Sequence, residues 1–157
     1  MLAEQIMTAE VLTVLPDDEA AKVIPLMKEG GVRMIPVVDG DGKVAGMINS
    51  LSLLGRIVPK YIASGDLDGV SYAPDIGVFK QKFCHLKECK VRDVMEPSPT
   101  LVHPDDSLLS VAAALFTEDR YDCVIVVDDD NRLCGVISAS DILFRLKLLA
   151  EDEECDA

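Results

Sequence analysis

The chain has 157 residues, 49% of them hydrophobic, which is enough for one domain or for two small halves sharing a core. Its formal net charge of −13 at pH 7 disfavours nucleic acid and anionic membranes as partners, because both would be repelled. No apolar run is as long as a membrane span, Met1 to Thr8 lacks a signal-peptide pattern, and five irregularly spaced cysteines suit a reduced setting, so we expect a cytoplasmic protein.

An internal repeat organises the chain from its first residues onward. With Met7 placed on Met95, the segment Val14 to Val23 aligns with Val102 to Val111, including a shared Pro-Asp-Asp. After one extra residue in the second copy, Val37-Val38-Asp39 aligns with Val126-Val127-Asp128, and Gly46 aligns with Gly135. The chain therefore consists of two copies of one unit.

Each copy predicts the order β-α-β-β-α. A short strand over 12–15 or 100–103 leads into Pro-Asp-Asp, whose aspartates are predicted to cap a helix over 16–29 or 104–118. Pro25 lies inside the first of these helices, where proline should kink or shorten it. Strands over 34–38 and 44–48, or 123–127 and 133–137, flank an Asp-rich turn typical of a hairpin, and a final helix contains Leu53-Leu54 or Ile142-Leu143.

The repeat also predicts the domain organisation. Residues 1–58 form the first motif, 91–149 form the second, and 150–157 form an acidic tail. Residues 59–90 have no counterpart in the repeat, and we expect an ordered insertion there because turn signals alternate with apolar residues such as Phe79 and Phe83.

Three kinds of segment in these copies resemble the CBS (cystathionine-β-synthase-type) domain family. They are the leading segments Val91–Met95 and Ala3–Met7, the hairpin Ile35–Gly46, and the segment Gly135-Val136-Ile137-Ser138-Ala139-Ser140-Asp141. The resemblance implies a mixed α/β (α+β) fold in which two motifs pair through their sheets, with an approximate two-fold axis and two clefts. It also implies a homodimer, an adenine nucleotide or S-adenosylmethionine as ligand, and regulation of another protein.

The second copy carries the stronger candidate site. Asp141 can accept both hydroxyl protons of a ribose, and Ser138 can help to hold a phosphate at a helix N-terminus. The alternative is ordinary helix capping, with Asp141 pairing with Arg145 one turn on. The resemblance implies that the adenine lies between two walls, one made of Thr100, Leu101 and Val102 and the other of Tyr121, Asp122, Cys123 and Val124.

The first copy departs from this pattern. It has Asn49 and Ser52 where the second copy has Ser138 and Asp141, and Ser52 cannot replace a carboxylate on a ribose. Arg33 aligns with Asp122, so a cation in one wall matches an anion in the other. We expect a weaker, empty or differently adapted second cleft, formed by Arg33, Met34, Ile35, Asn49 and Ser52.

These features favour a ligand-sensing regulatory module over an enzyme, because no nucleophile–base arrangement, P-loop or Rossmann glycine pattern is present. We expect an adenosine-containing ligand, with AMP as the leading candidate, no required cofactor, and a separate, unidentified regulated protein. A ligand-independent dimeric scaffold is the alternative. A metal or redox sensor built on Cys84, His85 and Cys89 is a third possibility, disfavoured by the irregular spacing, so no metal site is predicted.

Overall fold

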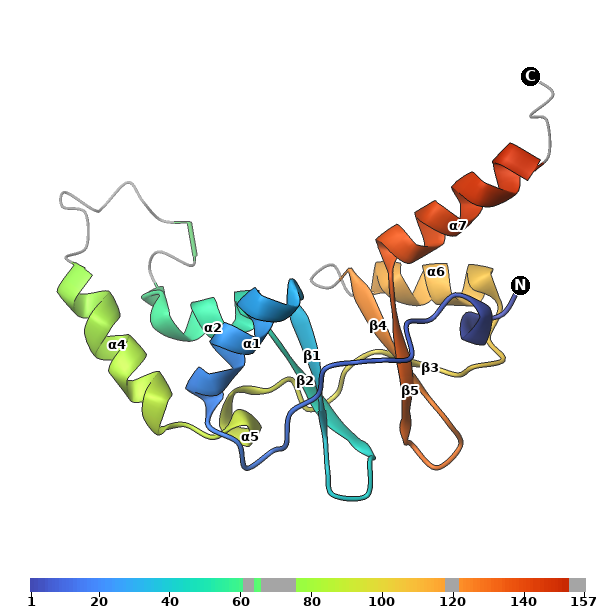
Figure 1. The fold of residues 1–157 in the computed structure, drawn as a ribbon. Helices are drawn as coiled ribbons and strands as arrows, with labels where there is room; N and C mark the ends of the chain where they lie inside the picture. The colour runs from blue at the N-terminus through green and yellow to red at the C-terminus, as the bar shows by residue number, and fades with distance from the viewer. Residues whose placement is uncertain (61–63, 66–75, 118–121, 153–157) are drawn as a thin grey trace. The chain divides into compact units, whose positions relative to one another are not determined.

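The fold, a computed structural model, describes residues 1–60, 64–65, 76–117 and 122–152 (Figure 1). It is of the α+β class, with short helices on two small sheets. Two compact units each combine segments that are distant in sequence. One contains Met1–Val11, Val38–Val44 and the described part of Ser98–Ala157, and the other contains Leu12–Val37 and the described part of Ala45–Pro97.

The unit that holds the second copy has a three-stranded sheet in the order β3-β4-β5. Strand β3 (Leu101–Val102) runs parallel to β4 (Cys123–Val127), and β4 pairs antiparallel with β5 (Leu133–Ser138). Helix α6 (Leu108–Thr117) connects β3 to β4, and α7 (Ala139–Asp152) follows β5 directly. The β-α-β-β-α order expected from the repeat is therefore confirmed in this copy.

The unit that holds the first copy has the two-stranded sheet β1-β2. Its elements are the 3₁₀ turn η2 (Ala20–Lys22), α1 (Val23–Gly30), β1 (Met34–Val38), β2 (Val44–Asn49), α2 (Ser50–Ile57), α4 (Ile76–Glu88) and α5 (Val91–Val94). The strand expected over 12–15 is wrong, because only one parallel bridge, Val14 to Val37, forms there. The turn signals of the insertion lie at 64–66 and 72–75, mostly outside the described residues.

The helices that follow Pro-Asp-Asp begin later than the sequence predicts. The Asp18 and Asp106 carboxylates accept hydrogen bonds from the N–H groups of Leu15 and His103, at 2.8 and 2.7 Å, and so close the preceding turns instead of capping helices. The prediction of aspartate N-caps is therefore wrong. Ser107 caps α6 instead, because its Oγ accepts a bond of 3.1 Å from Ser110 N–H.

The late start of α1 also explains Pro25. Pro25 is the third residue of α1, which begins at Val23 after the 3₁₀ turn. The N–H groups of the first turn of a helix have no partner within that helix. A proline there forfeits no helical hydrogen bond, and of the kinked or shortened helix expected at this position the structure has the shortened one, with eight residues in α1.

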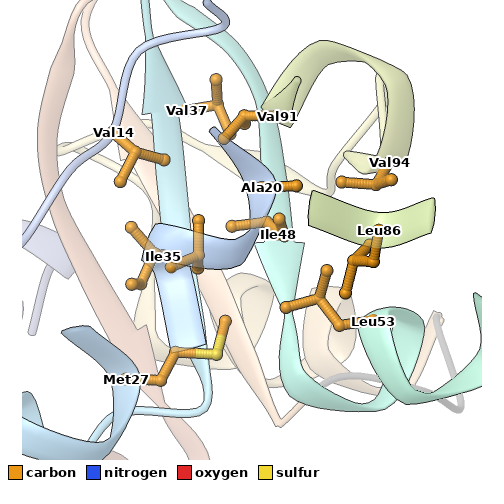
Figure 2. Packing of buried hydrophobic residues seen from close by; sticks show 11 residues of the cluster. Val14, Ala20, Met27, Ile35, Val37, Ile48, Leu53, Leu86, Val91 and Val94 are labelled. Atoms are coloured by element: carbon orange, nitrogen blue, oxygen red, sulfur yellow. The ribbon is translucent and has the colours of Figure 1, made fainter. Parts of the chain in front are cut away.

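Each unit has its own hydrophobic core. In the first copy, Ile35, Val37 and Ile48 of the β1-β2 sheet are fully buried (Figure 2). Leu86 of α4 completes this core, together with Val91 and Val94 of α5 (Figure 2). The described part of the insertion is therefore packed into the first copy's core. In the second copy, the core gathers Ala3, Val102, Val111, Val124, Val126, Ile137 and Ile142.

The leading segments of the two copies are exchanged between the sheets. Thr8, from the start of the chain, forms an antiparallel bridge with Val136 of the second copy, while Glu96 forms the equivalent bridge with Met47 of the first. Alignment by the repeat would have assigned Thr8 to the first copy and Glu96 to the second. This exchange explains why the compact units are not two continuous halves of the sequence.

Within the described ranges, no helix is both long enough and apolar enough to cross a bilayer.

Candidate functional site

The second copy's candidate site lies where β4 begins and β5 ends. Ser138, the last residue of β5, pairs directly across from Cys123, the first residue of β4. The Asp122 carbonyl accepts a 2.9 Å hydrogen bond from the N–H of Ala139, the first residue of α7. The fold thus brings Asp122, Cys123 and Ser138 to the N-terminus of a 14-residue helix.

Ser138 and Asp141 hydrogen-bond to each other in both directions. Asp141 Oδ2 accepts bonds from the backbone N–H and the Oγ of Ser138, each at 2.7 Å, and the Asp141 N–H donates to Ser138 Oγ at 3.2 Å. Ser138 Oγ also lies 2.8 Å from Ser140 Oγ. This is a reciprocal capping arrangement, which satisfies two backbone groups at the start of α7.

The pairing of Asp141 with Arg145, part of the capping interpretation, is not seen among the described residues. There the bonds of Asp141 go to Ser138, and Arg145 Nε is buried without a hydrogen-bond partner. The Ser138 bonds fix Asp141 through Oδ2. A ligand would therefore meet a carboxylate whose position is already set by the protein.

The predicted walls of the site differ in accessibility. Leu101 is 39% exposed, whereas Val102 and Val124 are 4% and 2% exposed and belong to the second copy's core. Thr100 is half-buried, and its carbonyl accepts a 3.3 Å bond from Ile125 N–H. Val102 and Val124 can offer a ligand only their backbone unless the core opens. Tyr121 lies outside the described residues.

Two carboxylates give the site a negative character. The pKa of the Cys123 thiol is raised to about 12, first by burial and then by the charges of Asp122 and Asp141. Both aspartates therefore act on the same thiol, and an approaching anion would meet the same two charges. The thiol itself stays protonated at neutral pH, which makes it a poor nucleophile.

The first copy repeats the backbone frame without the carboxylate. Ser50 N–H donates to the Arg33 carbonyl at 3.0 Å, as Ala139 does to Asp122. Asn49 Oδ1 accepts a 2.7 Å bond from Ser52 N–H, and Ser52 Oγ donates to the Asn49 carbonyl at 3.0 Å. Asn49 caps α2 through its side-chain amide oxygen and is only 6% exposed.

The remaining residues of the predicted first cleft are Met34 and Ile35. Met34 is half-buried and Ile35 is fully buried in the core, so Ile35 does not reach a ligand with its side chain. Directly after α4, the Cys89 thiol donates to the His85 carbonyl at 3.4 Å. The described residues contain no cluster of three or more His, Cys, Asp or Glu side chains able to hold a metal ion.

The first copy also contains a cavity that the sequence did not predict. It has a volume of about 510 Å³, lies between α1 and α2, and is lined mainly by apolar side chains, together with Lys28, Arg33 and Ser50. Arg33 is the one residue that it shares with the predicted first cleft. The spacing of apolar residues along α1 and α2 predicts that each helix has a buried face. Whether two such faces leave a cavity depends on how the helices pack, which the spacing does not show.

Comparison with known proteins agrees with the repeat. The profile of the CBS domain matches this chain twice, over residues 3–59 and 91–148. An uncharacterised protein of Methanocaldococcus jannaschii is 28% identical over 91% of this chain and 89% of its own length. Inosine-5'-monophosphate dehydrogenase of the same organism is 26% identical over 92% of this chain, which spans only 23% of that enzyme.

Solved structures show the same fold. CBSX2 from Arabidopsis thaliana superposes with a TM-score of 0.75 at 20% identity, covering 97% of both chains. A structure of CBSX2 in complex with AMP gives a TM-score of 0.71 at 21% identity, covering 96% of this chain and 98% of that one. The two profile matches cover the chain except for the insertion and the two ends. This chain therefore belongs to the CBS domain family.

Proposed function

We propose that this chain is a regulatory module that senses an adenosine-containing ligand, with AMP as the leading candidate, at Ser138 and Asp141. The observation that carries the proposal is the placement of a fixed carboxylate and a hydroxyl at the N-terminus of α7. A ribose diol can bond to the carboxylate, and a phosphate favours the positive end of a helix. The reciprocal cap pre-organises both groups, which lowers the cost of ordering them on binding.

The charge of the site favours a ligand with few phosphates. Asp122 and Asp141 are close enough to Cys123 to raise its pKa, so each added phosphate charge would be opposed by two carboxylates. AMP is therefore favoured over ADP and ATP. S-adenosylmethionine, which carries a positive sulfonium, is the other ligand of the predicted class that suits this charge.

The relatives support the ligand class. CBSX2, whose fold this chain shares, has a structure in complex with AMP. The match to the dehydrogenase covers less than a quarter of that enzyme, so its catalytic activity is not transferred to this chain. We infer a non-catalytic role in which ligand binding shifts the population of two states and a separate protein responds. A cytoplasmic location remains a prediction.

A homodimer is part of the proposal. On α6, Leu109 and Phe116 are 80% and 86% exposed and lie two turns apart on one side of the helix. On α7, which packs against α6, Leu143 and Phe144 are 66% and 62% exposed. Large exposed apolar side chains on two packed helices favour an interface, and a two-fold dimer would bury the same residues of both copies.

A ligand-independent dimeric scaffold is the second candidate function. The capping bonds between Ser138 and Asp141 favour it, because they give both side chains a purely structural role. The scaffold would use the same α6–α7 face for dimerisation. The two functions therefore differ in ligand binding and not in assembly.

Isothermal titration with AMP, ATP and S-adenosylmethionine tests the proposal. We expect AMP to bind the unmodified protein and Asp141→Asn to bind it about tenfold more weakly, a change of about 1.4 kcal/mol. Absence of binding by all three ligands at millimolar concentration would favour the scaffold.

Sedimentation tests the dimer. We expect Phe116→Glu to give monomers, because it would place two like charges in the interface.

A further inference from the structure

The inserted helix α4 belongs to a basic segment of an acidic chain. From Ile76 to Arg92 the sequence has five Lys or Arg residues and one acidic residue, Glu88, whereas the whole chain has 15 and 28. This segment precedes the second copy and has no counterpart within the repeat, and the second copy forms its β-α-β-β-α unit without such a helix. The positive charge of α4 is therefore not required by the repeated fold.

A groove lies between α4 and the end of α2, which is its neighbour in the same unit (Figure 1). Its volume is about 430 Å³. Ile57 and Phe83 pack against the first copy's core and also line the groove, whereas Phe79 lines it without belonging to that core. The rest of the lining comes from one side of α4 and consists of Lys80, Cys84 and Lys87.

The groove combines apolar side chains with two cations. Lys80 and Lys87 are exposed, and no carboxylate lines the groove among the described residues. The Lys87 Nζ lies 5.7 Å from the centroid of the Phe83 ring, a cation–π contact that places its charge beside the apolar lining. An occupant that complements this groove brings apolar side chains flanked by negative charge.

This groove is separate from the face used in the proposed homodimer. Five of the six described residues that line it belong to α4, which has no counterpart in the second copy, so the groove does not correspond to the α6–α7 face. A two-fold contact through the groove would also bring the lysines of one copy against those of the other. The geometry therefore disfavours a second copy of this chain as the occupant.

We propose that the α4 groove binds a short acidic segment of another protein. Apolar side chains of that segment would pack on Ile57, Phe79 and Phe83, and its carboxylates would lie beside Lys80 and Lys87. A nucleic acid or an anionic membrane spreads its charge widely and would meet the net charge of −13 of the whole chain. A short segment stays within the screening length of about 8–10 Å around α4, where the basic residues dominate.

The identity of the partner rests on the proposed function, in which a separate protein responds to the ligand. The α4 groove would be the surface to which that protein binds. The binding itself needs no ligand at Asp141, because the groove lies in the unit that holds the first copy and Asp141 lies in the other unit.

Fluorescence anisotropy with a labelled peptide of glutamate, leucine and phenylalanine tests the proposal, and a peptide with glutamine in place of every glutamate is the neutral probe. We expect the acidic peptide to bind the full chain and Lys80→Gln to weaken it about 2- to 5-fold, the range for one exposed ion pair. The neutral peptide should bind more weakly and should not respond to Lys80→Gln.

Two further variants separate charge from packing. Lys90→Gln is the matched control, because Lys90 is an exposed lysine of the same basic segment that does not line the groove. Phe79→Ala should weaken the acidic peptide at least about fivefold, because it removes an apolar contact surface that lies outside the first copy's core.

Three outcomes would overturn the proposal. The first is no binding of the acidic peptide by the unmodified protein up to millimolar concentration. The second is equal weakening by Lys80→Gln and Lys90→Gln, which would indicate a general charge effect. The third is binding of phosphatidylserine vesicles that depends on Lys80 while peptide binding does not, which would make α4 a membrane-binding surface. Asp141→Asn should leave peptide binding unchanged in the absence of AMP, so failure of this proposal and failure of AMP binding can be told apart.

Discussion

Gly42 and Asn131 occupy equivalent positions in the two hairpin turns, and both have left-handed backbones, with φ of 79° and 63°. Their bonds are also equivalent: the Asn131 carbonyl accepts a 3.0 Å bond from Val44 N–H, and the Gly42 carbonyl accepts a 3.1 Å bond from Leu133 N–H. Asn131 adds a side-chain bond of 3.1 Å from Nδ2 to the Val44 carbonyl. The two hairpin tips are therefore joined by a pair of bonds that follow the repeat, with one extra bond from asparagine.

This relationship predicts different effects of two substitutions at Asn131. Asn131→Gly keeps the left-handed backbone and loses one side-chain hydrogen bond, so we expect about 0.5–1.5 kcal/mol of lost stability. Asn131→Ala loses the same bond and keeps a Cβ without the short polar side chain by which asparagine tolerates a left-handed backbone, so it should be roughly 1–2 kcal/mol less stable than Asn131→Gly. Urea denaturation of both variants measures the difference, and equal losses would contradict it.

The exchanged leading segments predict that Gly46 and Gly135 resist substitution. A Cβ on Gly46 would lie 2.4 Å from the Glu96 carbonyl oxygen, and one on Gly135 would lie 2.7 Å from that of Thr8. Either alanine must push a backbone segment away, so we expect losses of about 1–3 kcal/mol in urea denaturation.

Gly55 is the matched control for these two glycines. It lies in α2, and an added Cβ would meet nothing within 4 Å. Gly55→Ala should therefore stabilise the protein by roughly 0.5–1 kcal/mol, the usual helix preference for alanine. Destabilisation at all three glycines alike would show that the close approach of the leading segments is not the cause.

Asp141 is predicted to contribute to both stability and ligand binding. Asp141→Ala removes two bonds to Ser138, so we expect about 1–2 kcal/mol of lost stability with the fold retained, together with at least a roughly tenfold loss of AMP affinity. Ser52→Ala should change AMP binding little, because Ser52 has no carboxylate to offer. Calorimetry and urea denaturation of both variants separate the two roles, and equal loss of AMP affinity in both would refute the asymmetry.

The raised pKa of Cys123 predicts slow alkylation in the folded protein. A shift from 9.0 to about 12 lowers the thiolate fraction at pH 8 by roughly a thousandfold, so iodoacetamide should modify Cys123 far faster in urea than in buffer. Mass spectrometry of the labelled peptide measures both rates. Asp141→Asn removes one of the charges that raise this pKa, so it should speed labelling of Cys123 in the folded protein. An unchanged labelling rate would show that Asp141 has no influence on the thiol.

The same shift fixes the direction of a pH effect on stability. Below pH 9 the thiol is protonated in both the folded and the unfolded chain, so it contributes no pH dependence. Between pH 9 and about 12 only the unfolded chain releases the proton, which favours unfolding as pH rises. Cys123→Ala should therefore reduce the loss of stability across that window in urea titrations at stepped pH, and an unchanged pH profile would contradict this.

The repeat, the strands over 34–38 and 123–127, and the two hairpins could be predicted from the sequence. Their signals are local, because β-branched runs and Asp-Gly or Asp-Asn turns select strand and turn within a few residues. The helix starts could not be predicted so well. Asp18 and Asp106 are good caps in isolation, but their carboxylates bond instead to the preceding turns.

The sequence also determined which polar residues stand at the start of the last helix in each copy, Asn49 and Ser52 in one and Ser138 and Asp141 in the other. Only the tertiary structure decided that Asp141 is already bonded to Ser138, that Thr8 and Glu96 lie on each other's expected sheets, and that α1 and α2 enclose a cavity beside Lys28. These features depend on contacts between segments far apart in the chain or on the geometry of packed side chains. Spacing along a sequence records the faces of single elements, and which faces meet is settled when the cores of the two units form.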